Sequence, residues 1–332
     1  MREKLYCKEK RYPLWRGFRK SVRGIVALEP NIAHSPSVTN HYRGVFMVLL
    51  GAVLWGVSGS AAQVLFQRMH FAPGWLVHIR MTASGIMLLG YVGVRYGPGR
   101  VFEIWRSAKD AGRLVLLALV GLLGVQYTYF AAIADSNAAT ATLLQYLAPV
   151  LVVLWALIEN RSRPKTRQTL AVIAAVFGTS LLVTNGKLAA LGISVGGLVW
   201  GLSSALALAF YSIYPRRLLT IYGSLPIVGW CMLLGGITMG FFHPTWKVSA
   251  TITPASLYLI AFVVICGTMI AFSLFTASLK VITSEEASLL SCAEPLASAV
   301  FAVLFLHLRL SPLGWIGALL ILVAVVILSR SR

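Results

Sequence analysis

Residues 114–134 read LVLLALVGLLGVQYTYFAAIA and carry no charge. About 20 such residues are what a helix needs to cross the hydrocarbon core of a bilayer. Similar runs return from residue 44 to the C-terminal end of the chain, whose 332 residues are 58% hydrophobic and only 12% charged. Ordinary soluble domains hold about a quarter charged residues. Lipid is therefore the expected solvent for most of this chain, and the expected fold is an all-α, multi-pass membrane protein.

Ten apolar segments can be marked in this way. They cover residues 44–66, 75–94, 113–134, 138–158, 168–184, 195–214, 224–243, 255–279, 285–306 and 312–329, of which the fifth and the seventh are the weakest. The sequence thus predicts ten transmembrane helices. We divide the chain into a basic extension at 1–43, a first five-helix repeat at 44–184 and a second five-helix repeat at 195–329.

An internal repeat links the two groups of segments. When residues 121–150 are laid on residues 267–296, an offset of 146, Ala141-Thr142-Leu143-Leu144 falls on Ala287-Ser288-Leu289-Leu290 and Pro149 falls on Pro295. A unit with an odd number of helices that is duplicated in tandem must enter the membrane upside down relative to its copy. Inverted repeats of this kind are the architecture of many secondary transporters, with the binding site near the midplane.

Lys and Arg fall unevenly on the connections between segments, and in membrane proteins the cytoplasmic loops hold their excess. If residues 1–43 are inside, the inner set contains this basic tail, the Arg95–Arg113 loop, residues 161–167, Arg216, Arg217, Lys280 and the C-terminal arginines. The outer set holds Arg68, Lys187, Lys247 and Arg309 alone. The sequence predicts both termini in the cytoplasm, and we expect the plasma membrane as the location.

The formal net charge of +19 follows from these loops. It does not indicate a nucleic-acid partner, because the basic residues lie between apolar runs and not on one water-exposed face. The basic extension at 1–43 is either an amphipathic segment on anionic lipid or a disordered tail. The four cysteines lack the short spacings of zinc sites and redox pairs, so we expect no disulfide framework, no metal and no cofactor.

A resemblance to a known family rests on Trp55-Gly56, Arg80, Leu143–Pro149 and Glu285–Pro295. From residue 44 to the C-terminus the chain resembles the EamA family of the drug/metabolite transporter superfamily. The run Glu286–Leu290 followed by Glu294-Pro295 is similar to members that export amino acids, amines and related metabolites. The chain departs from the family at Leu306–Arg309, where members often have an acidic residue after the ninth helix.

Pro149 and Pro295 stand at matching places in the two repeats. Each removes a helical hydrogen bond, so Pro149 should release the carbonyl of Gln145 and Pro295 that of Ser291. Paired interruptions of this kind point to the binding region of a transporter, whereas transmembrane prolines also occur as simple structural kinks. We predict a kink or gating role for both prolines and leave the structural alternative open.

Glu294 is the strongest candidate for a functional residue. It lies about nine residues into its segment and so near mid-bilayer, where an ionised group costs at least about 2.5 kcal/mol. We predict that Glu294 contacts an amine-bearing substrate or a coupling proton, the alternative being a structural carboxyl. Arg80 lies closer to the predicted outer face, so it either faces a cavity or snorkels to the headgroups. His78, two residues away, is expected on a different face of the same helix.

Further polar and aromatic side chains in the apolar segments are candidates to line a small-molecule pocket. With Arg80 and Glu294, the predicted substrate-binding set is Trp55, Gln126, Tyr129, Gln145, Tyr211 and Ser291. Four aromatic residues near segment ends are instead predicted to anchor the membrane interface, namely Trp75, Tyr91, Trp155 and Tyr222.

Secondary transport of a small organic solute, such as an amino acid or an amine, is the function that these features favour. We expect export by alternating access between the two repeats, driven by the solute gradient or by proton exchange. The chain has no glycine-rich phosphate loop ending in Lys and Ser or Thr that would power transport by nucleotide hydrolysis. A lipid-carrier flippase and a membrane-embedded lipid-modifying enzyme stay open as alternatives, although we expect no enzymatic activity. The expected partners are the solute, protons and membrane lipids, with the oligomeric state left open.

Overall fold

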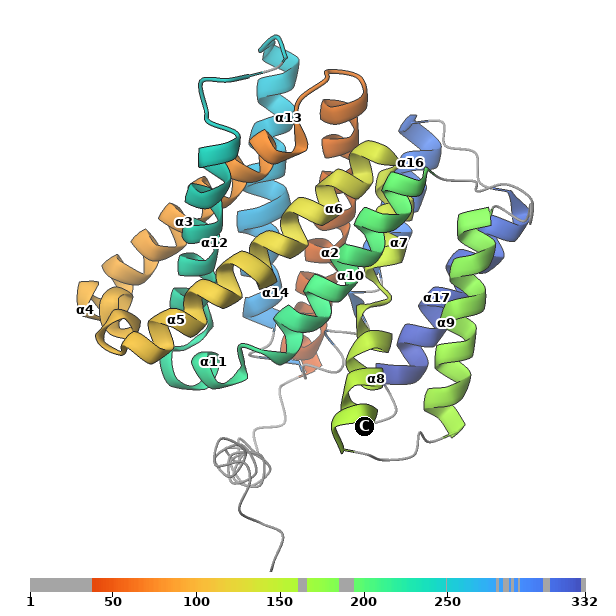
Figure 1. Ribbon diagram of the computed structural model, residues 1–332, viewed down its shortest axis with the longest axis horizontal. Coiled ribbons are helices and arrows are strands. Elements are labelled where there is room, and N and C mark those ends of the chain that lie inside the picture. The colour runs from red at the N-terminus through yellow and green to blue at the C-terminus, as the bar shows by residue number, and fades with distance from the viewer. Residues whose placement is uncertain are drawn as a thin grey trace, which may run out of the picture. The chain divides into compact units, whose positions relative to one another are not determined.

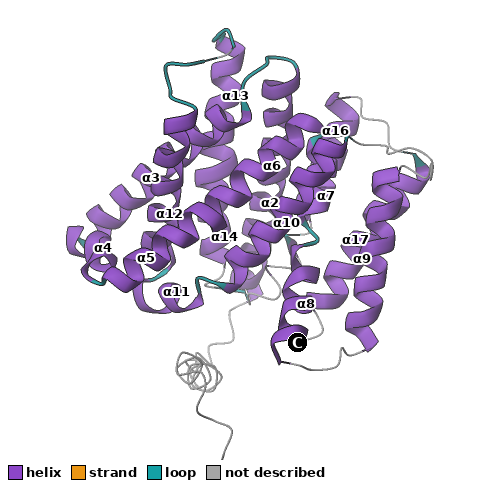
Figure 2. Ribbon diagram, in the orientation of Figure 1, coloured by secondary structure: helices purple, strands orange, loops and turns teal. Residues whose placement is uncertain are grey.

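The computed structural model describes residues 38–160, 166–184, 194–248, 250–278, 281–282, 287, 290–291, 293–306 and 311–329. Every regular element in these residues is a helix (Figure 1, Figure 2). The chain divides into a unit at Met1–Thr39 and a unit at Asn40–Arg332, and the contacts below belong to the second unit. Of the basic extension predicted at 1–43, residues 1–37 lie outside the described part, and a helix already starts at Val38.

The helices fall into two groups along the chain. The first group is α2 (Val38–Gln67), α3 (Pro73–Tyr96), α4 (Pro98–Phe102), η1 (Glu103–Arg106), α5 (Ala108–Leu116), η2 (Leu117–Leu123), α6 (Gly124–Asp135), α7 (Ala138–Gln145), α8 (Ala148–Asn160) and α9 (Thr166–Thr184). The second group is α10 (Val195–Ile213), α11 (Arg216–Tyr222), α12 (Ser224–Phe242), α13 (Pro254–Val264), η3 (Ile265–Ile270), α14 (Ala271–Ser278), α16 (Ala293–Leu306) and α17 (Pro312–Ser329).

Six helical stretches are long and apolar enough to cross a membrane, by length and composition. They are His41–Gln67, Pro73–Tyr96, Ala108–Asp135, Val195–Ile213, Ser224–Phe242 and Pro254–Phe275. Four further apolar helical stretches in the described part of the chain are shorter: Ala138–Val152, Thr169–Leu181, Ala293–Leu306 and Pro312–Ala324. The structure therefore supports a helical, multi-pass membrane protein, and the count of ten spans stays a prediction.

Local capping chemistry fixes where several helices start. The side chain of Asn137 accepts a hydrogen bond from the N–H of Thr140 (2.8 Å) at the start of α7. Thr253 and Ser256 form a reciprocal capping box, with Pro254 as the first residue of α13. These side chains satisfy N–H groups that the helix itself leaves without a partner.

The same backbone irregularity occurs at matching places in the two groups. The helix from α5 to α6 contains the π-helical stretch η2, and the helix from α13 to α14 contains the π-helical stretch η3. Gly121 lies in η2 and Gly267 in η3, the two glycines that the offset of 146 aligns. π-helical turns are rare and often occur at functional sites, so their repetition agrees with an internal duplication.

Helix breaks also recur at the two aligned prolines. In the first group α7 ends at Gln145 and α8 starts at Ala148, so that Pro149 is the second residue of a new helix. In the second group α16 starts at Ala293, and Pro295 is its third residue. Proline is tolerated in a first helical turn, where the missing N–H would have no partner within the helix. The predicted kinks are thus complete interruptions.

Counterpart helices from the two groups pack against each other in antiparallel pairs. α3 packs along α12, with Gly74 against His243 at one end and Leu89 against Gly229 at the other. Because the residue numbers rise along one helix while they fall along the other, the two helices run in opposite directions. This arrangement is expected when one five-helix unit is turned over relative to the other.

Two more pairs follow the same pattern. α7 packs against α16, where Ala139 contacts Ala302 near the start of α7 and Tyr146 contacts Ser291 just beyond its end, so this pair is antiparallel as well. α9 and α17 also pack side by side (Figure 1). The second, fourth and fifth segments thus each contact their own counterparts.

Connections that the charge pattern assigns to one side of the membrane lie together. Asp110, at the start of α5, is hydrogen-bonded to Tyr222 at the end of α11. At the opposite ends of α3 and α12, the indole N–H of Trp75 donates to the carbonyl of Thr245 (3.2 Å) and the ring of His78 lies 3.0 Å from its hydroxyl. The connection that holds Asp110 and the one that holds Thr245 therefore lie at different ends of the α3–α12 pair.

Two of the four interface-anchor predictions are wrong. Trp75 is only 6% and Tyr222 only 8% exposed, because each reaches a polar partner in the other half of the chain. Tyr91 and Trp155 are 55% exposed and remain compatible with an interface role.

Candidate functional site

The centre of the candidate site is Glu294, in the first turn of α16. Its carboxylate oxygen Oε2 lies 3.2 Å from the hydroxyl of Tyr146, which follows α7 at the equivalent break in the first group. The same hydroxyl donates to the carbonyl oxygen of Ser291 (2.7 Å), which also accepts from the N–H of Glu294 (2.9 Å). This is the carbonyl that Pro295 is predicted to release. One tyrosine thus joins the two helix breaks.

α2 approaches this break closely because residue 56 is glycine. A Cβ at Gly56 would lie 2.6 Å from the carbonyl oxygen of Glu294 and 2.8 Å from the backbone nitrogen of Ser298. Both are backbone atoms of α16, which cannot turn aside as a side chain can. Beside it, the indole of Trp55 packs edge-on against Phe272 of α14, with ring centroids 5.1 Å apart. The Trp55-Gly56 pair therefore lies at a contact between three helices.

Arg80 is buried, with 7% of its surface exposed, and does not snorkel to the headgroups. Its Nε donates to the hydroxyl of Thr268 in η3 (2.6 Å), and its guanidinium lies 5.0 Å from the ring centroid of Phe130. Its charge also interacts with that of Glu294. The side chain of Arg80 therefore points into the helix bundle. His78 points instead to Gly236 and Thr245, as expected for a different helix face.

Tyr129 brings a second buried hydroxyl to this region. It lies 2.8 Å from the hydroxyl of Thr142, which donates to the carbonyl of Ala138 (2.7 Å), so Tyr129 is the donor in the first of these bonds. The phenol interacts electrostatically with both Glu294 and Arg80. Gln126 lies one turn earlier on α6, and its side chain, 7% exposed, makes no hydrogen bond in the described part of the chain.

The remaining predicted residues lie at different distances from Glu294. Gln145, at the end of α7, donates from Nε2 to the hydroxyl of Ser204 (2.7 Å) and so ties α7 to α10. Tyr211 lies seven residues after Ser204 on α10, about 10 Å from Ser204 along the helix axis. Its ring packs against Gly121. The structure therefore groups Arg80, Tyr129, Ser291 and Glu294, places Gln145 in a helix contact and leaves Tyr211 apart.

Sequence reasoning missed the side chains that hold the charged groups in place. Thr268 and Phe130 position Arg80, and Thr142 positions Tyr129. The sequence does contain a pointer to Thr268, because this residue follows Gly267, which the internal repeat aligns with Gly121. Both Gly267 and Thr268 lie in the π-helical stretch η3. Neither Phe130 nor Thr142 differs by type from the many apolar and small residues around it.

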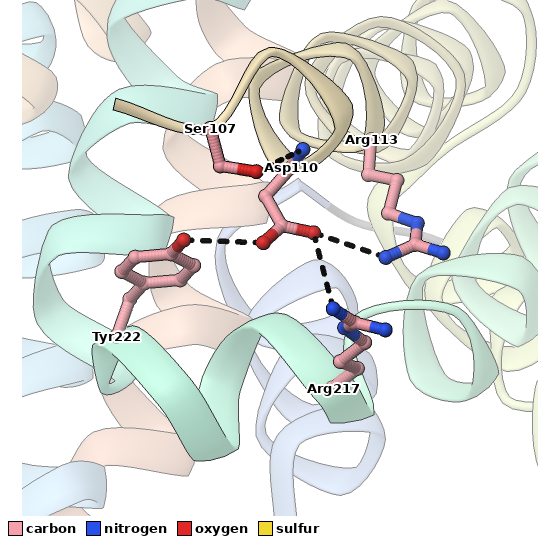
Figure 3. Close-up of polar contacts among 5 residues, drawn as sticks. All are labelled: Ser107, Asp110, Arg113, Arg217 and Tyr222. Carbon is pink, nitrogen blue, oxygen red and sulfur yellow. Dashed lines mark hydrogen bonds and ion pairs between the residues drawn. The ribbon is translucent and has the colours of Figure 1, made fainter. Parts of the chain in front are cut away.

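A second buried acid, Asp110, lies in the first turn of α5 and faces the side chains of Arg113, Arg217 and Tyr222 (Figure 3). Its carboxylate accepts from Arg113 (3.0 Å) and from the hydroxyl of Tyr222 (3.1 Å), and Arg217 lies 3.9 Å away. Its backbone N–H donates to the side chain of Ser107. Burial of Tyr222 and its hydrogen bond to Asp110 raise the pKa of the Tyr222 hydroxyl, which therefore keeps its proton. This cluster fastens α11 to α5.

We expect Asp110→Asn to lower the free energy of unfolding by about 1–3 kcal/mol, because Arg113 and Tyr222 lose a charged acceptor. The measurement is the melting temperature of the purified protein in detergent. Glu103→Gln is the control, since Glu103 pairs with Arg100 at the surface, where such pairs contribute at most about 1 kcal/mol. Equal melting temperatures for the two variants would show that the cluster is not structural.

These features define a polytopic helical membrane protein whose two halves meet at a buried polar centre. The model of the EamA-like transporter family matches the chain twice, over residues 42–184 and 195–330. The chain belongs to this family of transporters, in agreement with the resemblance seen in the sequence.

Relatives support the same assignment. The chain is 38% identical to the uncharacterized inner membrane transporter YicL of Salmonella typhimurium, over 86% of this chain and 95% of that protein. It is 23% identical to the uncharacterized transporter YwfM of Bacillus subtilis, over 86% of this chain and 93% of that protein. A protein of known crystal structure is similar in fold, with a TM-score of 0.56, 19% identity, and coverage of 87% of this chain and 96% of that one.

Proposed function

We propose that this protein is a secondary transporter that exports small amine-bearing metabolites, amino acids among them, by alternating access between two inverted five-helix repeats. The observation that carries the proposal is the position of Glu294, an acid at a helix break that is bonded to Tyr146 at the matching break in the other half. An acid within a transmembrane segment is costly and is retained mainly where it serves a substrate or a proton.

The antiparallel packing of α3 with α12 and of α7 with α16 supports the inverted arrangement. In this proposal all ten apolar helices span the membrane, and the α7–α8 and α16 regions do so as interrupted helices. Interrupted helices are tolerated in a membrane where neighbouring groups satisfy the exposed backbone, as Tyr146 does for the carbonyl of Ser291. Both termini then lie on the cytoplasmic side of the plasma membrane, with the basic loops.

Tyr146 gives a physical link between binding and opening. Its hydroxyl has one proton to share between the Ser291 carbonyl and the Glu294 carboxylate, which belong to one half while Tyr146 belongs to the other. An ammonium group or a proton that binds Glu294 competes with the hydroxyl of Tyr146 for the carboxylate. Binding therefore weakens the contact between the two halves of the protein. A ligand shifts a conformational equilibrium only through such differential contacts.

The direct test is a counterflow measurement with purified protein in liposomes. Labelled amines and amino acids are expected to accumulate in liposomes loaded with the same unlabelled compound, and a pH gradient is expected to change the rate if protons are exchanged. Liposomes that contain a detergent-inactivated sample serve as the control. A wild-type protein that moves no solute but flips or alters lipid would replace this proposal with one of the two lipid-directed functions.

A further inference from the structure

We infer that Arg80 binds a carboxylate group of the substrate while Glu294 binds its ammonium group, so that the transported compounds are zwitterions. The inference rests on the proposed function and narrows its substrate class. Arg80 has hydrogen-bonding capacity that the described residues do not use. A guanidinium has five N–H donors, and in the described part of the chain only the Nε donor of Arg80 makes a hydrogen bond.

The two terminal nitrogens of Arg80 have no hydrogen-bond partner in the described residues. They are not among the fully enclosed polar atoms that lack a partner, which are Ser84 Oγ and Ser298 Oγ, so they keep part of the small accessible surface of a residue that is 7% exposed. A buried charge that lacks hydrogen bonds is strongly unfavourable, and proteins normally compensate it. The ring of Phe130, 5.0 Å from the guanidinium carbon, compensates it in part. A ligand anion would complete the compensation.

Thr268 and Phe130 orient the guanidinium of Arg80. The hydroxyl of Thr268 donates to the carbonyl of Val263 (3.0 Å), so it presents a lone pair to Nε of Arg80. Together with Phe130, this contact sets the plane of the group and leaves the edge formed by Nη1 and Nη2 for a ligand. Two parallel N–H groups on one edge match the two oxygens of a carboxylate.

Glu294 supplies the opposite charge on the other half of the protein. Its Oε2 accepts from the hydroxyl of Tyr146, and its Oε1 has no hydrogen bond in the described residues. The described ion pairs are Arg100–Glu103, Arg113–Asp110 and Arg217–Asp110, and none of them joins Arg80 to Glu294, although the two charges interact. A small molecule that carries both an ammonium and a carboxylate satisfies both groups at once.

A compound with only one of these charges leaves a buried partner uncompensated. A site built to hydrogen-bond a substrate group strongly rejects analogues that lack it. We therefore expect transport of a zwitterion at a rate at least about tenfold above that of the amine made by removing its carboxylate, or of the acid made by removing its amine.

The experiment uses matched triads in proteoliposomes, for example phenylalanine, phenethylamine and 3-phenylpropionate, each at the same concentration. Wild-type protein is expected to move the amino acid at least about tenfold faster than the other two. Arg80→Gln is expected to lower amino-acid transport by at least about tenfold while it leaves amine transport unchanged or higher, so that the preference disappears. Arg80→Lys keeps the charge without the paired donors and should give an intermediate preference. Arg95→Gln is the matched control, because Arg95 is exposed at the end of α3.

Three outcomes would overturn the inference. If wild-type protein moves the amine or the acid as fast as the amino acid, the cargo is not selected as a zwitterion and the transport function still stands. If Arg80→Gln reduces amine and amino-acid transport by the same factor, Arg80 has only a structural role. If no member of any triad is moved by folded wild-type protein, the proposed function fails together with the inference.

Discussion

Glu294→Gln is expected to reduce the initial rate of substrate counterflow by at least about 30-fold. Truncating or neutralising one partner of a buried, hydrogen-bonded charge interaction costs about 2–5 kcal/mol, and every 1.4 kcal/mol is about a factor of ten. Glutamine keeps the shape of the side chain and can still accept from the hydroxyl of Tyr146, so the fold should persist. What it loses is the charge that attracts an ammonium group or carries a proton.

The control separates a loss of function from a loss of fold. Glu294→Gln should elute from size-exclusion chromatography as wild type does and melt within a few degrees of it. Glu103→Gln, at the surface between α3 and α5, should transport normally. Transport by Glu294→Gln at the wild-type rate at every pH tested would remove both the substrate and the proton role of this acid.

Gly56→Val is expected to abolish transport and to lower the yield of folded protein. The first side-chain atom would lie 2.6 Å from the Glu294 carbonyl oxygen, a separation that real Cβ atoms essentially never show. α2 would have to move away from α16, and the break that holds Glu294 would move with it. Overpacking of this kind typically costs about 1–3 kcal/mol, and more where backbone atoms are involved.

Gly90→Val in α3 is the matched control, because a Cβ at Gly90 meets nothing within 4 Å. Both glycines lie inside helices, so the two substitutions share the same intrinsic effect on helix formation. The comparison is made by the yield of monodisperse protein and by the counterflow rate. Similar results for the two variants would mean that the close approach of α2 to α16 is not needed.

The positions of the helices could be read from the sequence, because long apolar runs with local caps are a short-range signal. The predicted segment at 312–329 coincides with α17, and those at 195–214 and 224–243 end within a residue of α10 and α12. The prediction of which apolar segments are weakest was less accurate. The seventh, judged weak, is among the six long candidate spans, whereas the fourth and the ninth are short because the helices break near Pro149 and Pro295.

The contacts of single side chains could not be read in the same way, because their partners are far away in the chain. Arg80 is bonded to Thr268, 188 positions later, and depth counted from the end of a segment does not tell which helix face it occupies. Tyr222 resembles an interface aromatic until Asp110, 112 positions earlier, is placed beside it. The broken helices were foreseeable from the aligned prolines, but the tyrosine that joins the breaks was only one of several aromatic candidates.

Labelling of equivalent loops can show whether the two halves have opposite orientations in the membrane, as we propose. Gly99 lies in the connection after α3, and Lys247 in the corresponding connection after α12; both are exposed. Single cysteines are introduced as Gly99→Cys and Lys247→Cys in a transport-active background that lacks the native cysteines, and intact cells are treated with a membrane-impermeant maleimide. We expect labelling of the cysteine at position 247 in intact cells, and of the one at position 99 only after permeabilisation. Labelling of both cysteines from the same side would contradict the opposite orientations.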